Sequence, residues 1–288
     1  MASLVGGLRR LSNRVLLLQK ARSADAFLAS YPKSGRTWFR YILANYLNIS
    51  ATLNVDVNLH TMFTVIPNFD MDPVRGIPAF QFHAVRPKVP LILVTHRSYQ
   101  RLVFQRRPVI FMVRDVRDVA VSAYFHATRH KHRYTGEIGA FLRDPAQGVP
   151  AIIRYLNSWA DNLHLHPHVI ISYEMLSADP KGAATNALRF LGCDIHDDAL
   201  NRAIQVSRFE AMQNREQLEG IPAHEYDRDD SESLRMRRGK AGGYHAYLSS
   251  DEVAYIDRFC LEHSTPAARK VLGATDVRMF NGLSEASG

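Results

Sequence analysis

The sequence has few of the features that mark disulfide-rich, membrane-spanning or disordered chains. Its 288 residues include only two cysteines, Cys193 and Cys260, too few for a disulfide framework or a multi-cysteine metal site. No run of 18 or more apolar residues occurs, which argues against a transmembrane helix. Hydrophobic residues make up 46% and charged residues 22%, the composition of a globular chain. The scarcity of cysteine fits a reducing compartment, so we expect a cytoplasmic protein.

Negative charge is also in short supply. The chain has 36 lysine and arginine residues against 28 aspartate and glutamate residues, which gives a net charge of +8. Such an excess favours an anionic partner, for example a nucleotide, a nucleic acid, an acidic glycan or a membrane surface.

The first 24 residues differ from the rest of the chain. Leucine and valine recur there at spacings of three and four, which puts them on one helical face: Leu4, Leu8, Leu11, Val15 and Leu18. Basic residues surround this face, so peripheral membrane contact through residues 4–22 is one interpretation. We favour a helix that docks on its own domain or on a partner. The chain then divides into a basic amphipathic helix over 1–24, a main domain over 25–280 and a tail over 281–288.

In the main domain, short apolar runs alternate with helical patterns. Strands are expected over residues 26–31, 89–95, 109–113 and 169–173. Helices are expected over residues 37–47, 117–130, 151–163, 181–191, 197–208 and 251–262. Continuous apolar strands separated by helices indicate a single α/β domain with a central parallel sheet flanked by helices. Two stretches, 50–80 and 213–239, lack this periodicity and are expected to form lids or binding loops.

The segment YPKSGRTW, residues 31–38, joins the first expected strand to the first expected helix. Unpaired N–H groups and the helix dipole make such a junction an anion site, and Gly35 permits close backbone approach. The segment adds hydroxyl donors and positive charges: Lys33, Ser34, Arg36 and Thr37. A plain turn capped by Ser34 is the alternative. In a Walker A loop the lysine follows the second glycine, whereas Lys33 precedes Gly35, which argues against an ordinary ATP or GTP hydrolase.

This segment resembles the 5′-phosphosulfate-binding loop, usually YPKSGTTW, of the cytosolic-type sulfotransferases. Two later segments resemble motifs of that family in the same order. Residues 113–122, VRDVRDVAVS, are similar to its RNxKDVAVS segment, and residues 237–243, RRGKAGG, are similar to RKGxxGDW. These enzymes are relatives of the P-loop kinases and use 3′-phosphoadenosine 5′-phosphosulfate (PAPS). The resemblance implies a P-loop-kinase-like sulfotransferase fold and transfer of a sulfuryl group from PAPS to a hydroxyl of a small molecule or glycan.

The resemblance implies that the donor contacts all three motifs. Lys33 would stabilise the oxygen that leaves sulfur. The 5′-phosphate would contact residues of the first motif: Ser34, Gly35, Arg36 and Thr37. The 3′-phosphate would contact residues of the other two: Arg114, Ser122, Arg237, Arg238 and Gly239. The adenine would lie against Trp38, Tyr173, Ser207 and Phe209. Two residues have structural alternatives, since Arg114 could pair with a nearby aspartate and Trp38 could pack in the core.

The catalytic base implied by the resemblance is His96. The family reads KTH after its second strand, and this chain reads Val94-Thr95-His96. A neutral imidazole there would remove the proton of the acceptor hydroxyl. The assisting lysine of the family is missing, because Val94 occupies its position. His83 is the alternative base.

Other interpretations of the chain remain. A nucleotide kinase on a related scaffold would bind Mg-ATP, a nucleic-acid-binding protein would use the net charge, and a degenerate enzyme would bind nucleotide without turnover. We favour the sulfotransferase, with no nucleic-acid partner and no metal, since the histidine clusters lack carboxylates or cysteines at ligand spacing. Phenylalanines of residues 50–80 would suit an apolar acceptor, whereas basic side chains near residues 126–133 would suit an acidic one. The acceptor and the oligomeric state stay open.

Overall fold

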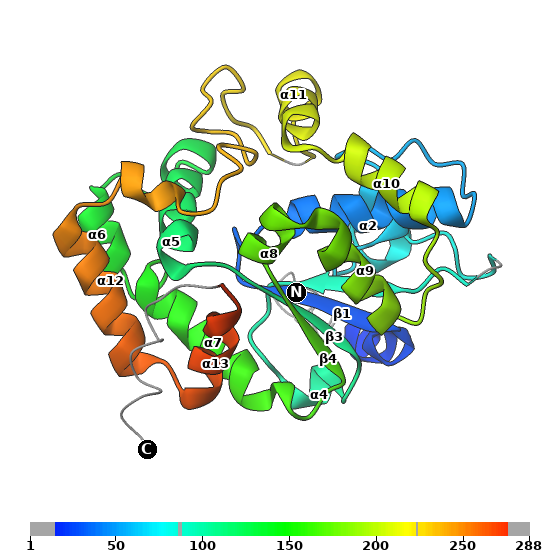
Figure 1. Ribbon diagram of the computed structural model, residues 1–288, viewed down its shortest axis with the longest axis horizontal. Coiled ribbons are helices and arrows are strands. Elements are labelled where there is room, and N and C mark those ends of the chain that lie inside the picture. Colours follow the sequence, from blue (N-terminus) through cyan, green and yellow to red (C-terminus); the bar gives the residue numbers. More distant parts are fainter. Residues whose placement is uncertain (1–14, 86–87, 223, 276–288) are drawn as a thin grey trace, which may run out of the picture.

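A parallel four-stranded sheet forms the centre of the computed structural model, which describes residues 15–85, 88–222 and 224–275 (Figure 1). The strands are β1 (Ala26–Ser30), β2 (Ile92–Thr95), β3 (Val109–Val113) and β4 (His168–Ser172). Their order is β2-β1-β3-β4, and every adjacent pair is parallel. Three of the strands are buried along their whole length, as expected for a sheet covered on both faces. The predicted α/β class with one central parallel sheet is confirmed.

Helices cover the two faces of the sheet and extend beyond it (Figure 1). They are α2 (Arg36–Ser50), α3 (Met62–Val65), α4 (Arg101–Phe104), α5 (Val116–Phe125), α6 (Ile138–Arg143), α7 (Val149–Leu163), α8 (Tyr173–Ala178), α9 (Pro180–Phe190), α10 (Asp197–Val206), α11 (Phe209–Glu219), α12 (Ser250–His263) and α13 (Pro266–Leu272). A π-helical turn, His126–His130, continues α5. Residues 15–23 are helical as well.

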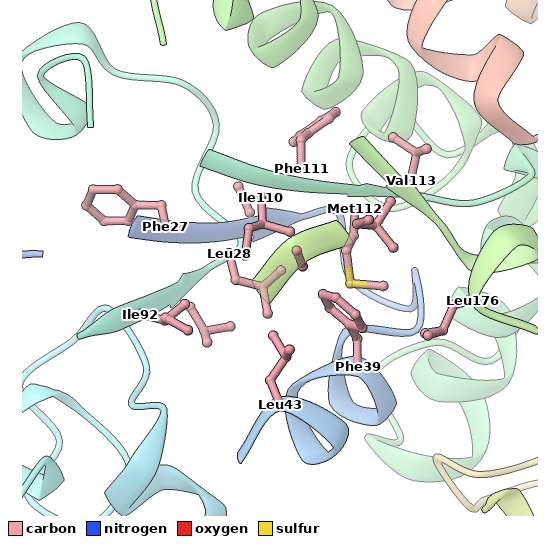
Figure 2. Packing of buried hydrophobic residues seen from close by; sticks show 14 of the residues in the cluster. Phe27, Leu28, Phe39, Leu43, Ile92, Ile110, Phe111, Met112, Val113 and Leu176 are labelled. Atoms are coloured by element: carbon pink, nitrogen blue, oxygen red, sulfur yellow. The ribbon is translucent and has the colours of Figure 1, made fainter. Parts of the chain in front are cut away.

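The core lies between the sheet and one long helix on each side. Figure 2 shows Phe39 and Leu43 of α2 on one face of the strands and Phe111 of β3 pointing to the opposite face. On that side the Phe111 ring stacks on Tyr155 and its centroid lies 5.7 Å from that of Trp159, both from α7. Burial of these aromatic rings supplies a large share of the apolar area that stabilises the sheet.

The structure corrects three local expectations. The second strand is shorter than 89–95, and Tyr173 begins α8 because the Ser172 hydroxyl caps that helix by accepting from the Met175 N–H at 3.0 Å. The first seven residues of the stretch 213–239 are helical, since α11 runs to Glu219. The fully buried residues of α11 are one methionine and one carboxylate, Glu216, so its sequence carries no apolar stripe.

The amphipathic N-terminal segment lies partly outside the described residues. Leu4, Leu8 and Leu11 are among the undescribed ones. In the described part Ala21 is buried, whereas Val15 is 48% exposed. Among the described residues, no helix has the length and apolar character needed to cross a membrane.

Parallel pairing brings the carboxyl ends of all four strands to one edge of the sheet. The residues that follow them are the 31–36 turn after β1, His96 after β2, Arg114 after β3 and Tyr173 after β4. Ligands of open α/β sheets bind at this edge. The fold therefore gathers most of the chemistry-bearing positions at one place.

Candidate active site

The turn between β1 and α2 is tightly wound. Gly35 has φ +88° and precedes the helix without any side-chain cap, so the first N–H groups of α2 have no capping partner from that residue. A Cβ atom at Gly35 would lie 2.4 Å from Cδ2 of Tyr173, which leaves room for glycine alone. Lys33 also has positive φ, at +73°. The turn thus exposes backbone donors at a helix N-terminus, the arrangement that binds phosphate.

A cavity of about 360 Å³ opens above this turn. Its wall contains most of the residues singled out in the sequence: Lys33, Gly35, Arg36, Thr37, Trp38, His96, Arg114, Ser122, Tyr173, Phe209, Arg237, Arg238 and Gly239. Ser34 and Ser207 are buried outside the wall. The backbone carbonyl of Ser207 accepts from the Trp38 indole at 2.8 Å, so this segment orients Trp38 without its hydroxyl. His83 is not part of the wall.

Arg114 is held from several sides. Its guanidinium lies 4.0 Å from the centroid of the Tyr173 ring, and its Nη2 donates to Asp118 Oδ2 at 3.2 Å and to the Lys240 carbonyl at 3.1 Å. The expected alternative pairing with Asp118 therefore exists, yet Arg114 still lines the cavity. Its Nε is buried without a hydrogen-bond partner among the described residues. A buried donor of this kind suits a ligand oxygen.

Asp118 of α5 binds the basic loop over residues 235–244, which we call the late loop. Its two carboxylate oxygens accept from the backbone N–H groups of Gly242 and Tyr244, each at 2.9 Å, in addition to Arg114. Figure 1 shows the chain after α11, coloured yellow to orange, returning toward α5. Asp118 is almost fully buried, so this carboxylate stabilises the loop and Arg114 together.

The rest of the late loop contacts α11 and aromatic side chains of α5 and α11. The fully buried Glu216 carboxylate accepts from the N–H groups of Arg235 and Met236, at 2.7 and 2.9 Å. Arg237 donates to Glu232 at 3.0 Å and lies 4.4 Å from the centroid of the Phe125 ring. At Gly239, with φ +63°, a Cβ atom would lie 2.3 Å from the Phe209 ring.

Lys33 sits in a strongly positive environment. Burial, followed by repulsion from Arg235 and with smaller contributions from Arg237 and Arg114, lowers the pKa of Lys33 to about 7. Glu216 acts in the opposite direction but does not offset these effects. An anionic ligand beside Lys33 would restore its full charge, because negative charge favours the ammonium form.

His96 is oriented by the sheet. Its Nδ1 lies 2.8 Å from the Ser30 carbonyl oxygen, which can only accept, so Nδ1 carries the proton and Nε2 keeps its lone pair. The side chain has accessible surface, and that surface faces the cavity. Burial and the charges of Arg36, Arg235 and Arg40 hold the pKa of His96 well below its usual value. The imidazole is therefore neutral and can accept a proton.

Several wall residues were not singled out from the sequence. Arg40 lies one helical turn after Arg36, on the buried face of α2. An arginine at a position on the buried face of a helix was the signal that could have identified Arg40 from the sequence. Arg75, His224 and Arg235 reach the wall from the two stretches expected to be binding loops. Apolar residues complete the wall: Met62, Met212 and Ile221, together with Phe63, one of the phenylalanines expected to suit an apolar acceptor. Val94, which occupies the position of the family's assisting lysine, lies in β2 with its side chain buried in the core.

Comparison with protein families and curated proteins gives consistent matches. Residues 23–267 match the family model described as the sulfotransferase domain. Sulfotransferase 1A1 of Canis lupus familiaris is 24% identical over 257 residues, which cover 85% of this chain and 84% of the relative. Cytosolic sulfotransferase 17 of Arabidopsis thaliana is 25% identical over 267 residues, covering 83% of this chain and 73% of the relative.

Solved structures share the fold. Mouse sulfotransferase SULT7A1, complexed with PAP, superimposes with a TM-score of 0.61 at 22% identity and covers 89% of this chain and 93% of its own. Retinol dehydratase, in a complex with retinol and PAP, gives a TM-score of 0.62 at 18% identity, covering 89% and 83%. At these identities the similarity establishes the architecture.

Proposed function

Since the chain belongs to the sulfotransferase domain family, we propose that it transfers a sulfuryl group from PAPS to the hydroxyl of a small-molecule acceptor. One observation carries the proposal: the three basic segments recognised in the sequence meet around one cavity at the carboxyl edge of the sheet. Mouse SULT7A1 and retinol dehydratase, which share the fold, bind PAP, the product that PAPS leaves behind.

The cavity wall fits such a donor. Lys33, the first N–H groups of α2 and the Thr37 hydroxyl would hold the 5′-phosphosulfate. Arg114 and Ser122 would bind the 3′-phosphate, with the buried Nε of Arg114 as a spare donor, and residues 237–239 would close over it. Trp38, Tyr173 and Phe209 would contact the adenine, since their rings line the same wall.

His96 and Lys33 would do the chemistry. Nε2 of His96 takes the proton of the acceptor hydroxyl as that oxygen forms its bond to sulfur. Lys33 stabilises the charge that develops on the 5′-phosphate oxygen as the sulfur–oxygen bond to it breaks. The products are a sulfate ester and PAP. The lysine that the family carries at Val94 is absent, and Arg36 supplies positive charge near His96 instead.

We also propose a cytoplasmic location, in line with the scarcity of cysteine and with a relative that is named as cytosolic. Glycan acceptors, the domain boundaries at residues 24 and 280, and membrane contact through residues 4–22 stay predictions.

Turnover of labelled PAPS against a panel of phenols, alcohols and glycans tests the proposal. Lys33→Ala and His96→Ala should each lose at least about 100-fold in turnover, the usual magnitude for a group that moves or stabilises charge in the transition state. The matched controls are Lys20→Ala and His164→Ala, at exposed positions outside the cavity, which should keep full activity.

Calorimetry with PAP and with Mg-ATP separates the sulfotransferase from a kinase. Tight PAP binding without Mg²⁺ supports the sulfotransferase. Binding of Mg-ATP in preference to PAP would overturn the proposed function, and full activity of Lys33→Ala would overturn the role of Lys33 in stabilising the leaving oxygen.

A further inference from the structure

Positive charge in the cavity wall far exceeds negative charge. Nine lysine and arginine residues line the cavity: Lys33, Arg36, Arg40, Arg75, Arg114, Arg235, Arg237, Arg238 and Lys240. The carboxylate in the same wall is Asp118, which already pairs with Arg114. Within the described residues the wall is therefore strongly basic. Three histidines, His96, His126 and His224, also line the wall.

These cations form two groups. Lys33, Arg114 and residues 237–240 surround the proposed donor site. Arg36, Arg40, Arg75 and Arg235, which we call the arginine cluster, lie close together: Arg40 follows Arg36 by one helical turn and donates to Asn68, whose N–H donates to the Arg75 carbonyl. Burial, together with repulsion within the cluster, lowers the pKa of Arg36, Arg40 and Arg235. Three of the four, Arg36, Arg40 and Arg235, also depress the pKa of His96. Asn68, which accepts from Arg40, bridges to Val94 two residues before His96, so the arginine cluster lies beside the proposed base, where the acceptor hydroxyl must bind. Arg235 lies near Lys33 as well.

Two members of the arginine cluster are already occupied. Arg40 is 2% exposed and donates to the Ile66 carbonyl and, at 3.0 Å, to Asn68 Oδ1. Arg75 pairs with Asp72 at 3.1 Å. These two side chains are fixed in place and contribute positive charge to this end of the cavity.

The other two members keep free donors. The Arg235 side chain makes one contact, Nη2 to His224 Nε2 at 2.7 Å, and its Nε is buried without a partner in the described chain. The Arg36 side chain forms no hydrogen bond or ion pair with any described residue, although it lines the cavity. Arg36 stands where the loop motif usually has threonine. The family resemblance implies a 5′-phosphate contact for this position, and we place the Arg36 guanidinium on the acceptor side instead.

Nearby carboxylates are directed elsewhere. Asp70 Oδ1 accepts from the Asp72 N–H at 3.0 Å. Glu216 turns both oxygens toward backbone N–H groups of the late loop and toward Tyr226. Neither Asp70 nor Glu216 lines the cavity. Arg36 and Arg235 are half-buried, and neither forms an ion pair with a described carboxylate, although Glu216 lies near enough to favour the charged form of Arg235. Such unpaired guanidinium groups are costly, so a ligand anion is a natural partner for them.

We propose that the acceptor of this enzyme is itself an anion, a hydroxylated molecule whose carboxylate, sulfate or phosphate group binds between Arg36 and Arg235. Its apolar body would contact Met62, Phe63 and Met212, which line the same cavity. The bound negative charge also offsets the repulsion around His96, so it makes that imidazole a stronger base when the acceptor is present. This inference rests on the proposed function.

Matched acceptor pairs test the inference. We compare kcat/KM for 4-hydroxyphenylacetate and 4-hydroxyphenylacetamide, and for further phenol and alcohol pairs that differ only in a carboxylate or a carboxamide. The carboxylate member should be preferred by roughly 10- to 100-fold, the usual range for a charge-assisted hydrogen bond. Arg235→Gln and Arg36→Gln should each reduce this ratio by about tenfold. Arg202→Gln, at an exposed position on α10, should leave the ratio unchanged.

Binding measurements give a readout that does not depend on turnover. Calorimetric titration of the same pairs into the PAP-loaded protein should show the same preference for the carboxylate member. Arg36→Gln should reduce this preference, which keeps the test available if Arg235→Gln fails to fold. Preference for the carboxamide, equal affinity for both members, or no binding of any carboxylate would overturn the inference. Failure of PAPS turnover together with failure of PAP binding would instead contradict the proposed function.

Discussion

The two ends of the cavity differ in how their positive charges are held. At the donor end, Arg114 contacts Asp118 and Tyr173, and Arg237 contacts Glu232, Tyr247 and Phe125. At the acceptor end, the Arg36 side chain has no partner among the described residues and the Arg235 guanidinium bonds only a histidine. Contacts within the protein thus fix Arg114 and Arg237 at the donor end, whereas Arg36 and Arg235 at the acceptor end form no ion pair with a described carboxylate.

The arginines at the two ends therefore differ: those at the donor end are preorganised by contacts with the protein, whereas Arg36 and Arg235 at the acceptor end are not balanced by a paired carboxylate. A guanidinium held by carboxylates and aromatic rings keeps its geometry without ligand, so little reorganisation is needed when the donor binds. An unpaired cluster costs stability until an anion arrives. The donor end therefore recognises its ligand through fixed geometry, and the acceptor end recognises its ligand through charge.

The largest expected effect comes from a substitution that disrupts the donor end of the cavity. Gly35→Ala places a Cβ atom 2.4 Å from Tyr173 Cδ2, at a backbone φ of +88° that alanine adopts poorly. The Tyr173 ring cannot yield easily, because it is 5% exposed and packs against Arg114 and Trp38. We expect PAP affinity to fall by at least about 100-fold, since the turn that holds the 5′-phosphate must move. Calorimetry measures this loss.

The control for that substitution is Gly273→Ala, whose added Cβ would meet nothing within 4 Å and whose φ is −56°. PAP should bind this variant normally. A Gly35→Ala protein that bound PAP within about threefold of the unaltered protein, a difference of less than 1 kcal/mol, would show that the turn does not grip the donor.

A smaller effect is expected when the contacts that fix Arg114 at the donor end are weakened. Asp118→Asn weakens the hold on Arg114 and on the backbone of residues 242–244, so Arg114 loses its fixed direction. We expect about tenfold weaker PAP binding and a loss of roughly 2–4 kcal/mol in the free energy of unfolding. Urea unfolding and calorimetry check both. Asp251→Asn, at an exposed position, is the control, and equal behaviour of the two variants would contradict the role of Asp118.

Removing charge should have opposite effects on stability at the two ends. Arg36→Gln relieves repulsion from Arg40 and Arg235 and should raise the free energy of unfolding by about 1 kcal/mol. Arg114→Gln leaves buried Asp118 without its counter-ion and should lower it by more than that. Urea unfolding in a low-salt buffer compares the two. If both substitutions destabilised the protein equally, the contrast between the ends would be lost.

The smallest expected effect is a proton linkage at Lys33. The pKa of Lys33 is about 7 in the free protein, and a bound phosphate raises it, so PAP binding takes up a proton above pH 7. The sign follows because the complex holds more protons than the free protein: affinity falls as pH rises through 7, by about fivefold between pH 7 and 8.

Calorimetry at pH 8 in buffers of different ionisation enthalpy measures this uptake, expected to approach about 0.9 proton. Lys33→Met should abolish the part due to Lys33. Unchanged proton uptake in that variant would show that Lys33 does not contact the 5′-phosphate.

Much of this site follows from the sequence for a simple reason. The 31–38 turn, His96, Arg114 and Tyr173 come directly after strands, and parallel pairing brings the ends of strands to one edge. The strand over Val109–Val113 was predicted residue for residue, because a run of five apolar side chains between Pro108 and Arg114 has few other interpretations. Local patterns therefore suffice for the sheet and for the donor end.

The acceptor end could not be predicted in the same way. Arg75 and Arg235 reach the cavity from loops distant in the sequence, and the position of Arg235 depends on a buried Glu216 in a helix with no apolar stripe. The direction of Arg36 depends on the charges and the space around it, which the loop motif does not encode. Such long-range contacts leave no periodic signal in the chain.

A crystal structure of the protein with PAP bound tests the central claim most directly. The account predicts the 3′-phosphate against Arg114 and Ser122, the 5′-phosphate on the turn at residues 33–37, and the guanidinium groups of Arg36 and Arg235 free of PAP and facing the remaining space. A complex in which Arg36 and Arg235 hold the phosphates of PAP, or in which Arg114 and Ser122 do not touch it, would contradict the division of the cavity into two ends.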